Sequence, residues 1–149
     1  MSEDRSKICS LTLYIVNVGK QFSEPSKLAS LSKTIGSFGK TVNEVICLEG
    51  SNWEGIVETK NDWFMIMYPE EYLDENLCEV LPTYLATDYD CFIFMRIKDT
   101  DKEGTSTPQV FQEPRLFRKS VKLQKGSLIP IDFEKIKFTR VLDGWLIGE

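Results

Sequence analysis

The sequence predicts one α/β domain built on parallel strands that helices cover. Short apolar runs rich in β-branched and aromatic residues recur along the chain, which is typical of strands buried on both faces. Segments between these runs place their apolar residues at helical spacing. The 149 residues, of which 42% are hydrophobic, suit a single domain spanning residues 1–149.

The first part of the chain predicts a strand, a helix and a second strand. We expect residues 1–9 to be a flexible leader. Residues 11–18 (LTLYIVNV) are a nearly continuous apolar run, and residues 28–38 place apolar side chains on one helical face. Residues 42–48 (VNEVICL) predict the second buried strand. This order favours a right-handed parallel βαβ unit.

Two more apolar strands are predicted in the middle of the chain. They are residues 63–68 (WFMIMY) and 91–97 (CFIFMRI), with a helix between them that Asp74 can cap. Pro82 is expected to end or kink that helix, because proline cannot donate the internal hydrogen bond. Residues 98–109 form the most loop-like stretch. Beyond them the pattern predicts short strands joined by turns.

Composition excludes several classes of function. The chain has no histidine, so it cannot use Ser-His-Asp or Cys-His catalysis or bind zinc through histidine. Its net charge of −5 provides no general attraction for nucleic acid. The four cysteines form no C-x-x-C motif, so the sequence does not support a zinc or redox motif. Three of them lie inside apolar runs, which indicates buried thiols in a reducing compartment. There is no signal peptide and no apolar run of ~20 residues, so we expect a cytoplasmic protein without a membrane span.

An acidic pair, Glu70 and Glu71, follows the predicted strand at residues 63–68. Two adjacent carboxylates at a strand end can hold a divalent cation through their oxygens. They can also supply a general base whose pKa the neighbouring charge adjusts. The alternative is an acidic loop that stabilises the N-terminus of the next helix.

Polar residues also follow the first two predicted strands. Asn17 ends the first strand, and Glu49 and Ser51 lie in the turn after the second. A carboxylate beside a Gly-Ser turn can hydrogen-bond a base or a ribose. Ordinary turn chemistry is the alternative. If the strands are neighbours, Asn17, Glu49 and Glu70 share one edge of the sheet.

A basic run stands out in this acidic chain. It consists of Arg115, Arg118, Lys119, Lys122 and Lys125. Arginine is suited to bidentate contacts with phosphate, so the run is a candidate site for a phosphate or another polyanion. A solvated strand face is the alternative.

Residues 11–120 resemble inverting glycosyltransferases of family 2 with a GT-A fold, especially the lipopolysaccharide-core type. The LTLYIVN and EVICLEGS segments are similar to the first two strands of that family. The later features come in the family's order: Trp63, Glu70-Glu71, Tyr89-Asp90, Arg96 and Arg115-Leu116-Phe117-Arg118. The resemblance implies a three-layer GT-A-like α/β domain with a mostly parallel central sheet, in truncated form.

The resemblance also implies roles for the candidate residues. Glu70 would bind Mg²⁺ or Mn²⁺ against the diphosphate of a nucleotide-sugar, and Glu71 is the remaining candidate for the catalytic base. The residues that would contact the nucleotide-sugar are Asn17, Glu49, Ser51, Arg115 and Arg118.

The chain also departs from the family. Tyr68 replaces the first Asp of Asp-x-Asp, and only ten residues separate the Gly-Ser turn from the third strand. The chain would therefore be a compact or degenerate member.

Two functions follow as hypotheses. The first is metal-dependent transfer of a sugar from a nucleotide-sugar donor to an acceptor. The second is a non-catalytic protein that uses the scaffold to bind a macromolecular partner or to form a homo-oligomer. The basic run from Arg115 to Lys125 adds a third possibility, contact with a polyanion, which salt should weaken steeply.

Overall fold

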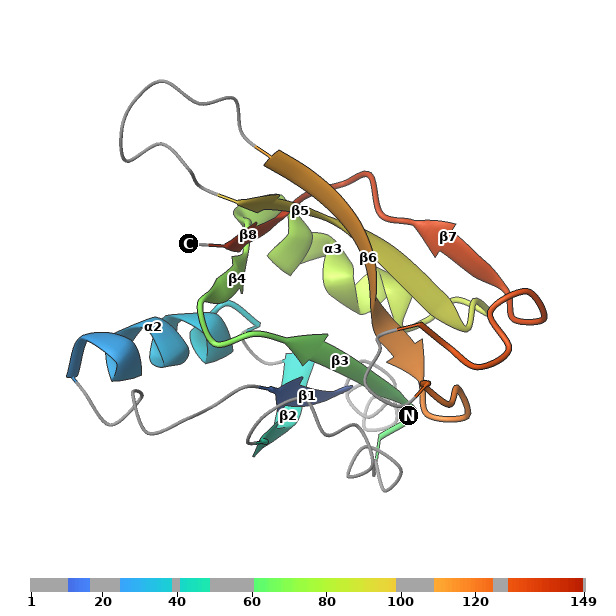
Figure 1. Cartoon of the computed structure of the whole chain (residues 1–149), viewed down its shortest axis with the longest axis horizontal. Coiled ribbons are helices and arrows are strands. Elements are labelled where there is room, and N and C mark those ends of the chain that lie inside the picture. Colours follow the sequence, from blue (N-terminus) through green and yellow to red (C-terminus); the bar gives the residue numbers. More distant parts are fainter. Residues whose placement is uncertain are drawn as a thin grey trace, which may run out of the picture.

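A computed structural model describes residues 11–16, 25–38, 41–48, 61–98, 109–124 and 129–148. The described elements form one curled, mixed β-sheet with two helices (Figure 1). In chain order they are β1 (Leu11–Ile15), α2 (Pro25–Gly36), β2 (Val42–Cys47), β3 (Trp63–Met67), β4 (Glu71–Leu73), α3 (Glu75–Tyr84), β5 (Cys91–Lys98), β6 (Gln109–Arg118), β7 (Phe138–Arg140) and β8 (Leu146–Gly148). No helix among these residues is long and apolar enough to cross a membrane.

The predicted parallel unit at the start of the chain is confirmed. Strands β1 and β2 pair in parallel, and α2 lies between them in the sequence. Every residue of β1 is fully buried, as its continuous apolar run predicts. Strand β3 pairs in parallel with the other side of β1, so β2, β1 and β3 are parallel neighbours.

The remaining strands make the sheet mixed. Strand β6 is antiparallel to both β3 and β5, and β4 is antiparallel to β8. The sheet follows the order β2-β1-β3-β6-β5-β8-β4, and β7 pairs with β5 off this path. The last strand, β8, therefore lies between β5 and β4 (Figure 1).

The expectation of a three-layer GT-A-like domain with a mostly parallel sheet is wrong. The sheet is mixed and curled, and both described helices pack against the same face. Phe38, which follows α2, and Leu77 of α3 share one apolar cluster with Leu13 of β1. On the opposite face, Tyr14 packs in a cluster with Val121, which follows β6. Among the described residues, coil rather than a helix thus covers this second face.

Helix α3 follows its predicted N-cap. The Asp74 carboxylate accepts a hydrogen bond from the Leu77 amide at 2.8 Å, and a second from the Trp145 amide at 3.0 Å. One side chain thus caps α3 and fixes the segment leading into β8. Pro82 lies inside α3, which ends two residues later at Tyr84. The helix therefore continues through the proline that was expected to end or kink it, and it ends within one turn after it.

Strand β2 lies at the end of the described sheet and its residues alternate between half-buried and exposed, where the sequence predicted a buried strand. Two further elements also differ from the sequence prediction. Strand β4 begins at Glu71, where the sequence predicted only a loop before α3. Strand β6 is ten residues long, where short strands were expected. Both differences reflect long-range pairing, because β4 is extended along β8 and β6 along β5.

Candidate functional site

The carboxyl ends of three parallel strands meet at one edge of the sheet. The Val16 amide donates a hydrogen bond to the Met67 carbonyl at 3.0 Å, and the Leu48 amide donates one to the Ile15 carbonyl at 2.8 Å. The ends of β1, β2 and β3 are thereby level with one another. Such an edge is where open α/β sheets commonly hold ligands.

Three of the predicted site residues lie outside the described part of the chain. They are Asn17, Glu49 and Ser51. Their positions follow only from the chain: Asn17 is bonded to Val16 and Glu49 to Leu48, and both of those neighbours lie at this edge.

Glu70 is the available carboxylate at the edge. It lies in the turn between β3 and β4, is partly exposed, and forms no ion pair with any residue that the structure describes. The turn is anchored to α2, because the Thr34 hydroxyl donates a hydrogen bond to the Pro69 carbonyl at 2.7 Å. The backbone that carries Glu70 is therefore fixed, while its side chain has no ion-pair partner in the part of the chain that the structure describes.

A divalent metal fits this position only with help from a ligand. Among the described residues, no group of three metal-binding side chains occurs. However, Mg²⁺ is commonly held by one or two carboxylates together with the phosphates of a substrate. Glu70 can supply one such carboxylate.

Glu71, the predicted catalytic base, is instead fully buried in a charge network. Its two carboxylate oxygens accept hydrogen bonds from Arg115 at 2.6 and 2.9 Å, and one also accepts the Tyr68 amide at 2.8 Å. Arg96 Nε donates a further hydrogen bond to this carboxylate.

The pKa of Glu71 follows from these contacts. Burial alone would raise the pKa of Glu71, but the charge and hydrogen bonds of Arg115 outweigh it, with help from Tyr68 and Arg96, and lower the pKa. A saturated, ionised carboxylate is a poor proton acceptor, so the geometry gives Glu71 a structural role.

Arg115 is the cationic centre of the same network. It is fully buried and also binds Glu113 at 2.5 Å and the Ile66 carbonyl at 3.1 Å. Burial acts to lower the pKa of Arg115, but Glu71 and Glu113 raise it overall. The guanidinium is therefore occupied and out of reach of a ligand. The predicted contact with a phosphate does not fit this geometry.

Arg118 is also held by protein groups. Its side chain donates hydrogen bonds to the Tyr89 carbonyl at 3.0 Å and to the Thr87 carbonyl. Its guanidinium lies 4.4 Å from the centre of the Trp63 ring. Arg118 thus fixes the turn before β5, which is a structural use of the residue.

The remaining members of the basic run are Lys119, Lys122 and Lys125. Lys119 lies 3.6 Å from Asp62, and both side chains are exposed. Lys122 is exposed and has no side-chain partner among the described residues, while Lys125 lies outside them. Because two of its five members are committed to structure, the run does not form a continuous basic surface.

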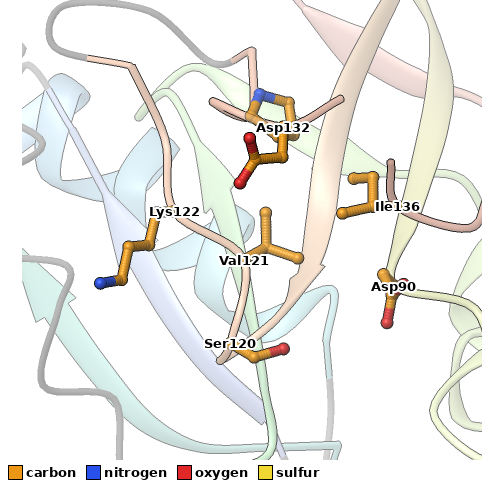
Figure 2. Close-up of a pocket in the computed structure, with 7 residues that line it drawn as sticks. Asp90, Ser120, Val121, Lys122, Asp132 and Ile136 are labelled. Atoms are coloured by element: carbon orange, nitrogen blue, oxygen red, sulfur yellow. The ribbon is translucent and has the colours of Figure 1, made fainter. Parts of the chain in front are cut away.

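A second location was missed by the sequence analysis. A hollow of about 320 Å³ opens where the end of β6 meets the loop before β7 (Figure 2). We call it the Val121 hollow. Its lining residues are Asp90, Ser120, Val121, Lys122, Pro130, Asp132 and Ile136. Of these, Lys122 was named from the sequence as part of the basic run and Asp90 only as part of the resemblance. The others were missed because they come from segments without periodicity.

No protein-family model and no curated protein matches this chain.

Proposed function

We propose that the protein binds a nucleotide-sugar at the carboxyl edge of β2, β1 and β3 and transfers the sugar to an acceptor. The observation that carries the proposal is the parallel adjacency of these three strands. That adjacency brings Glu70 to the same edge as the chain positions that precede Asn17 and Glu49. The proposal does not require a GT-A fold, because it rests on this edge alone.

The roles follow from what each side chain has available. Glu70 is unpaired among the described residues and would hold Mg²⁺ or Mn²⁺ together with the donor diphosphate. Asn17, Glu49 and Ser51 would hydrogen-bond the nucleoside. Glu71 and Arg115 act as positioning residues, since their ion pair ties β4 to β6 directly beside the turn that carries Glu70.

The test is a titration with UDP, GDP, CDP and ADP, each with and without Mn²⁺, read by calorimetry and thermal shift. A ligand that binds only the native state raises the melting temperature. We expect one nucleotide to give a metal-dependent shift that Glu70→Gln removes. The matched control is Glu75→Gln, an exposed acid in the first turn of α3, which should leave the shift intact. Equal shifts in wild type and Glu70→Gln would refute the site.

The second candidate is a non-catalytic binding protein. It is favoured by the sequestration of Glu71, which leaves Glu70 as the available acid of the pair. The two candidates differ in turnover. Nucleotide binding with release of nucleoside diphosphate from the matching donor supports transfer. Absence of binding to any nucleotide contradicts the donor site and favours the non-catalytic protein, which binds a macromolecular partner or a second copy of the chain instead.

A further inference from the structure

The Val121 hollow lies away from the proposed nucleotide-sugar edge. The Lys119 amide donates a hydrogen bond to the Asp62 carbonyl at 2.8 Å, which places the start of this segment at the amino end of β3. Glu70 follows the carboxyl end of the same strand. The two locations are thus separated by the length of β3, and an inference about the hollow is independent of the proposed function.

The walls of the hollow are built from packed backbone. The Val121 amide donates to the Arg118 carbonyl at 2.9 Å, and the Ile131 amide donates to the Lys122 carbonyl at 2.8 Å. Val121 itself is buried in the apolar cluster on this face of the sheet, and Ile136 packs against the same cluster. The hollow therefore has a fixed apolar floor, and its volume reaches the lower limit of sites for small molecules.

Polar side chains surround this apolar floor, and some of them have no hydrogen-bond or ion-pair partner among the described residues. The Asp90 carboxylate is already engaged, because it accepts the Lys137 amide at 3.0 Å and lies 3.7 Å from Arg118. The side chains of Ser120, Lys122 and Asp132 make no hydrogen bond or ion pair with the described part of the chain. Figure 2 shows the Asp132 carboxylate directed toward Val121, whereas the Lys122 ammonium is directed away from it.

The mixture of groups indicates the ligand chemistry. Asp132 can only accept hydrogen bonds and the Ser120 hydroxyl can both donate and accept them, whereas the Lys122 ammonium is directed away from Val121 and supplies no donor toward the floor. Hydroxyl groups both donate and accept, so a ligand that carries several of them can satisfy every position of the rim. A ring with one face of C–H groups can also cover the apolar floor. We propose that the Val121 hollow binds a small neutral polyol with an apolar face, of the size of one cyclitol or sugar ring.

The experiment follows backbone amide chemical shifts of the full chain during titration with myo-inositol and with glucose. Putrescine and leucine, which represent a diamine and a zwitterion, are titrated as alternative ligands. We expect one polyol to shift the amides of Ser120, Val121 and Ile136 with a millimolar Kd. Asp132→Asn should weaken that Kd about fivefold, which corresponds to the loss of one hydrogen bond.

The matched control is Glu134→Gln, an exposed acid in the same loop that does not line the hollow. It should leave the Kd unchanged. The proposal is overturned if neither polyol shifts these amides, if putrescine or leucine binds in their place, or if Glu134→Gln weakens binding as much as Asp132→Asn. Because Asp132 and Glu134 are both exposed, neither change should impair folding.

Discussion

Two adjacent glutamates in this chain, Glu70 and Glu71, lie in different environments. Glu70 is partly exposed and unpaired among the described residues, whereas Glu71 is fully buried between Arg115 and Arg96. The sequence identified the pair, and the resemblance implied that Glu71 is the catalytic base, but neither indicated that Glu71 is buried in an ion-pair network. The burial of Glu71 depends on Arg115, which lies 44 residues further along the chain. Local spacing contains no information about such a contact.

The Glu71 network makes a prediction about stability. Glu71→Gln leaves the buried Arg115 with only Glu113 as an anionic partner among the described residues. Breaking a buried ion pair in this way destabilises proteins by about 3–5 kcal/mol. We expect a loss of that size in the free energy of unfolding at pH 7, measured by urea denaturation. The control is Asp62→Asn, which removes an exposed partner of Lys119 and should cost less than about 1 kcal/mol.

The same prediction has a defined dependence on pH. The pKa of Glu71 is lowered in the folded state, so the unfolded chain binds its proton more readily. The contribution of Glu71 is therefore complete above the unfolded pKa of about 4.3 and is lost as the pH falls through the lower folded pKa. The difference between wild type and Glu71→Gln should shrink over that range. A difference that stays constant down to pH 2 would contradict the assignment.

At the scale of elements, the segment before β8 is in close contact with the start of helix α3. Asp74 accepts hydrogen bonds from both segments, and Gly144 packs directly against the start of α3. The sequence predicted the cap at Asp74 because capping is a local property. It could not predict the second hydrogen bond, from Trp145, because that partner is 71 residues away.

Gly144 should therefore tolerate no side chain. A Cβ atom there would lie 2.5 Å from the Asp74 carboxylate and 2.9 Å from the Leu77 amide nitrogen. We expect Gly144→Ala to destabilise the protein by about 1–3 kcal/mol, because the helix cap must shift. Gly36→Ala is the control, since a Cβ at Gly36 meets nothing within 4 Å. It should be neutral or stabilising by up to about 1 kcal/mol. Equal melting temperatures for the two variants would contradict this packing.

At the scale of the whole molecule, the sequence predicted the strands better than their arrangement. Strand β1 is completely buried, as predicted. However, one of its faces is covered by coil that contains Val121, and not by a helix. An apolar run predicts a strand but says nothing about what covers it, and for β2, whose residues alternate between half-buried and exposed, it overestimated the burial. It also does not distinguish parallel from antiparallel pairing, so the mixed sheet was missed. The parallel β1–β2 pair was predictable because a helix joins its strands.

Protection against hydrogen exchange should follow this arrangement. Strand β1 is fully buried and pairs on both sides, whereas β7 has three residues, pairs only with β5 among the described strands and exposes Phe138. We expect the β1 amides to exchange only through global unfolding and those of β7 to exchange far faster through local opening. Native-state exchange followed by NMR measures both. Equal protection of the two strands would contradict the difference in pairing and burial between β1 and β7.

The position of β8 has a consequence for how the chain folds during synthesis. Residues 146–148 pair with β5 on one side and with β4 on the other, and Gly148 packs against Arg96, which binds Glu71. While these residues are still inside the ribosome, β4 lacks its only strand partner among the described elements. We therefore expect a nascent chain to form the paired β2, β1 and β3 strands first. The pairing of β8 with β4 and β5 should form only after β8 has emerged from the ribosome.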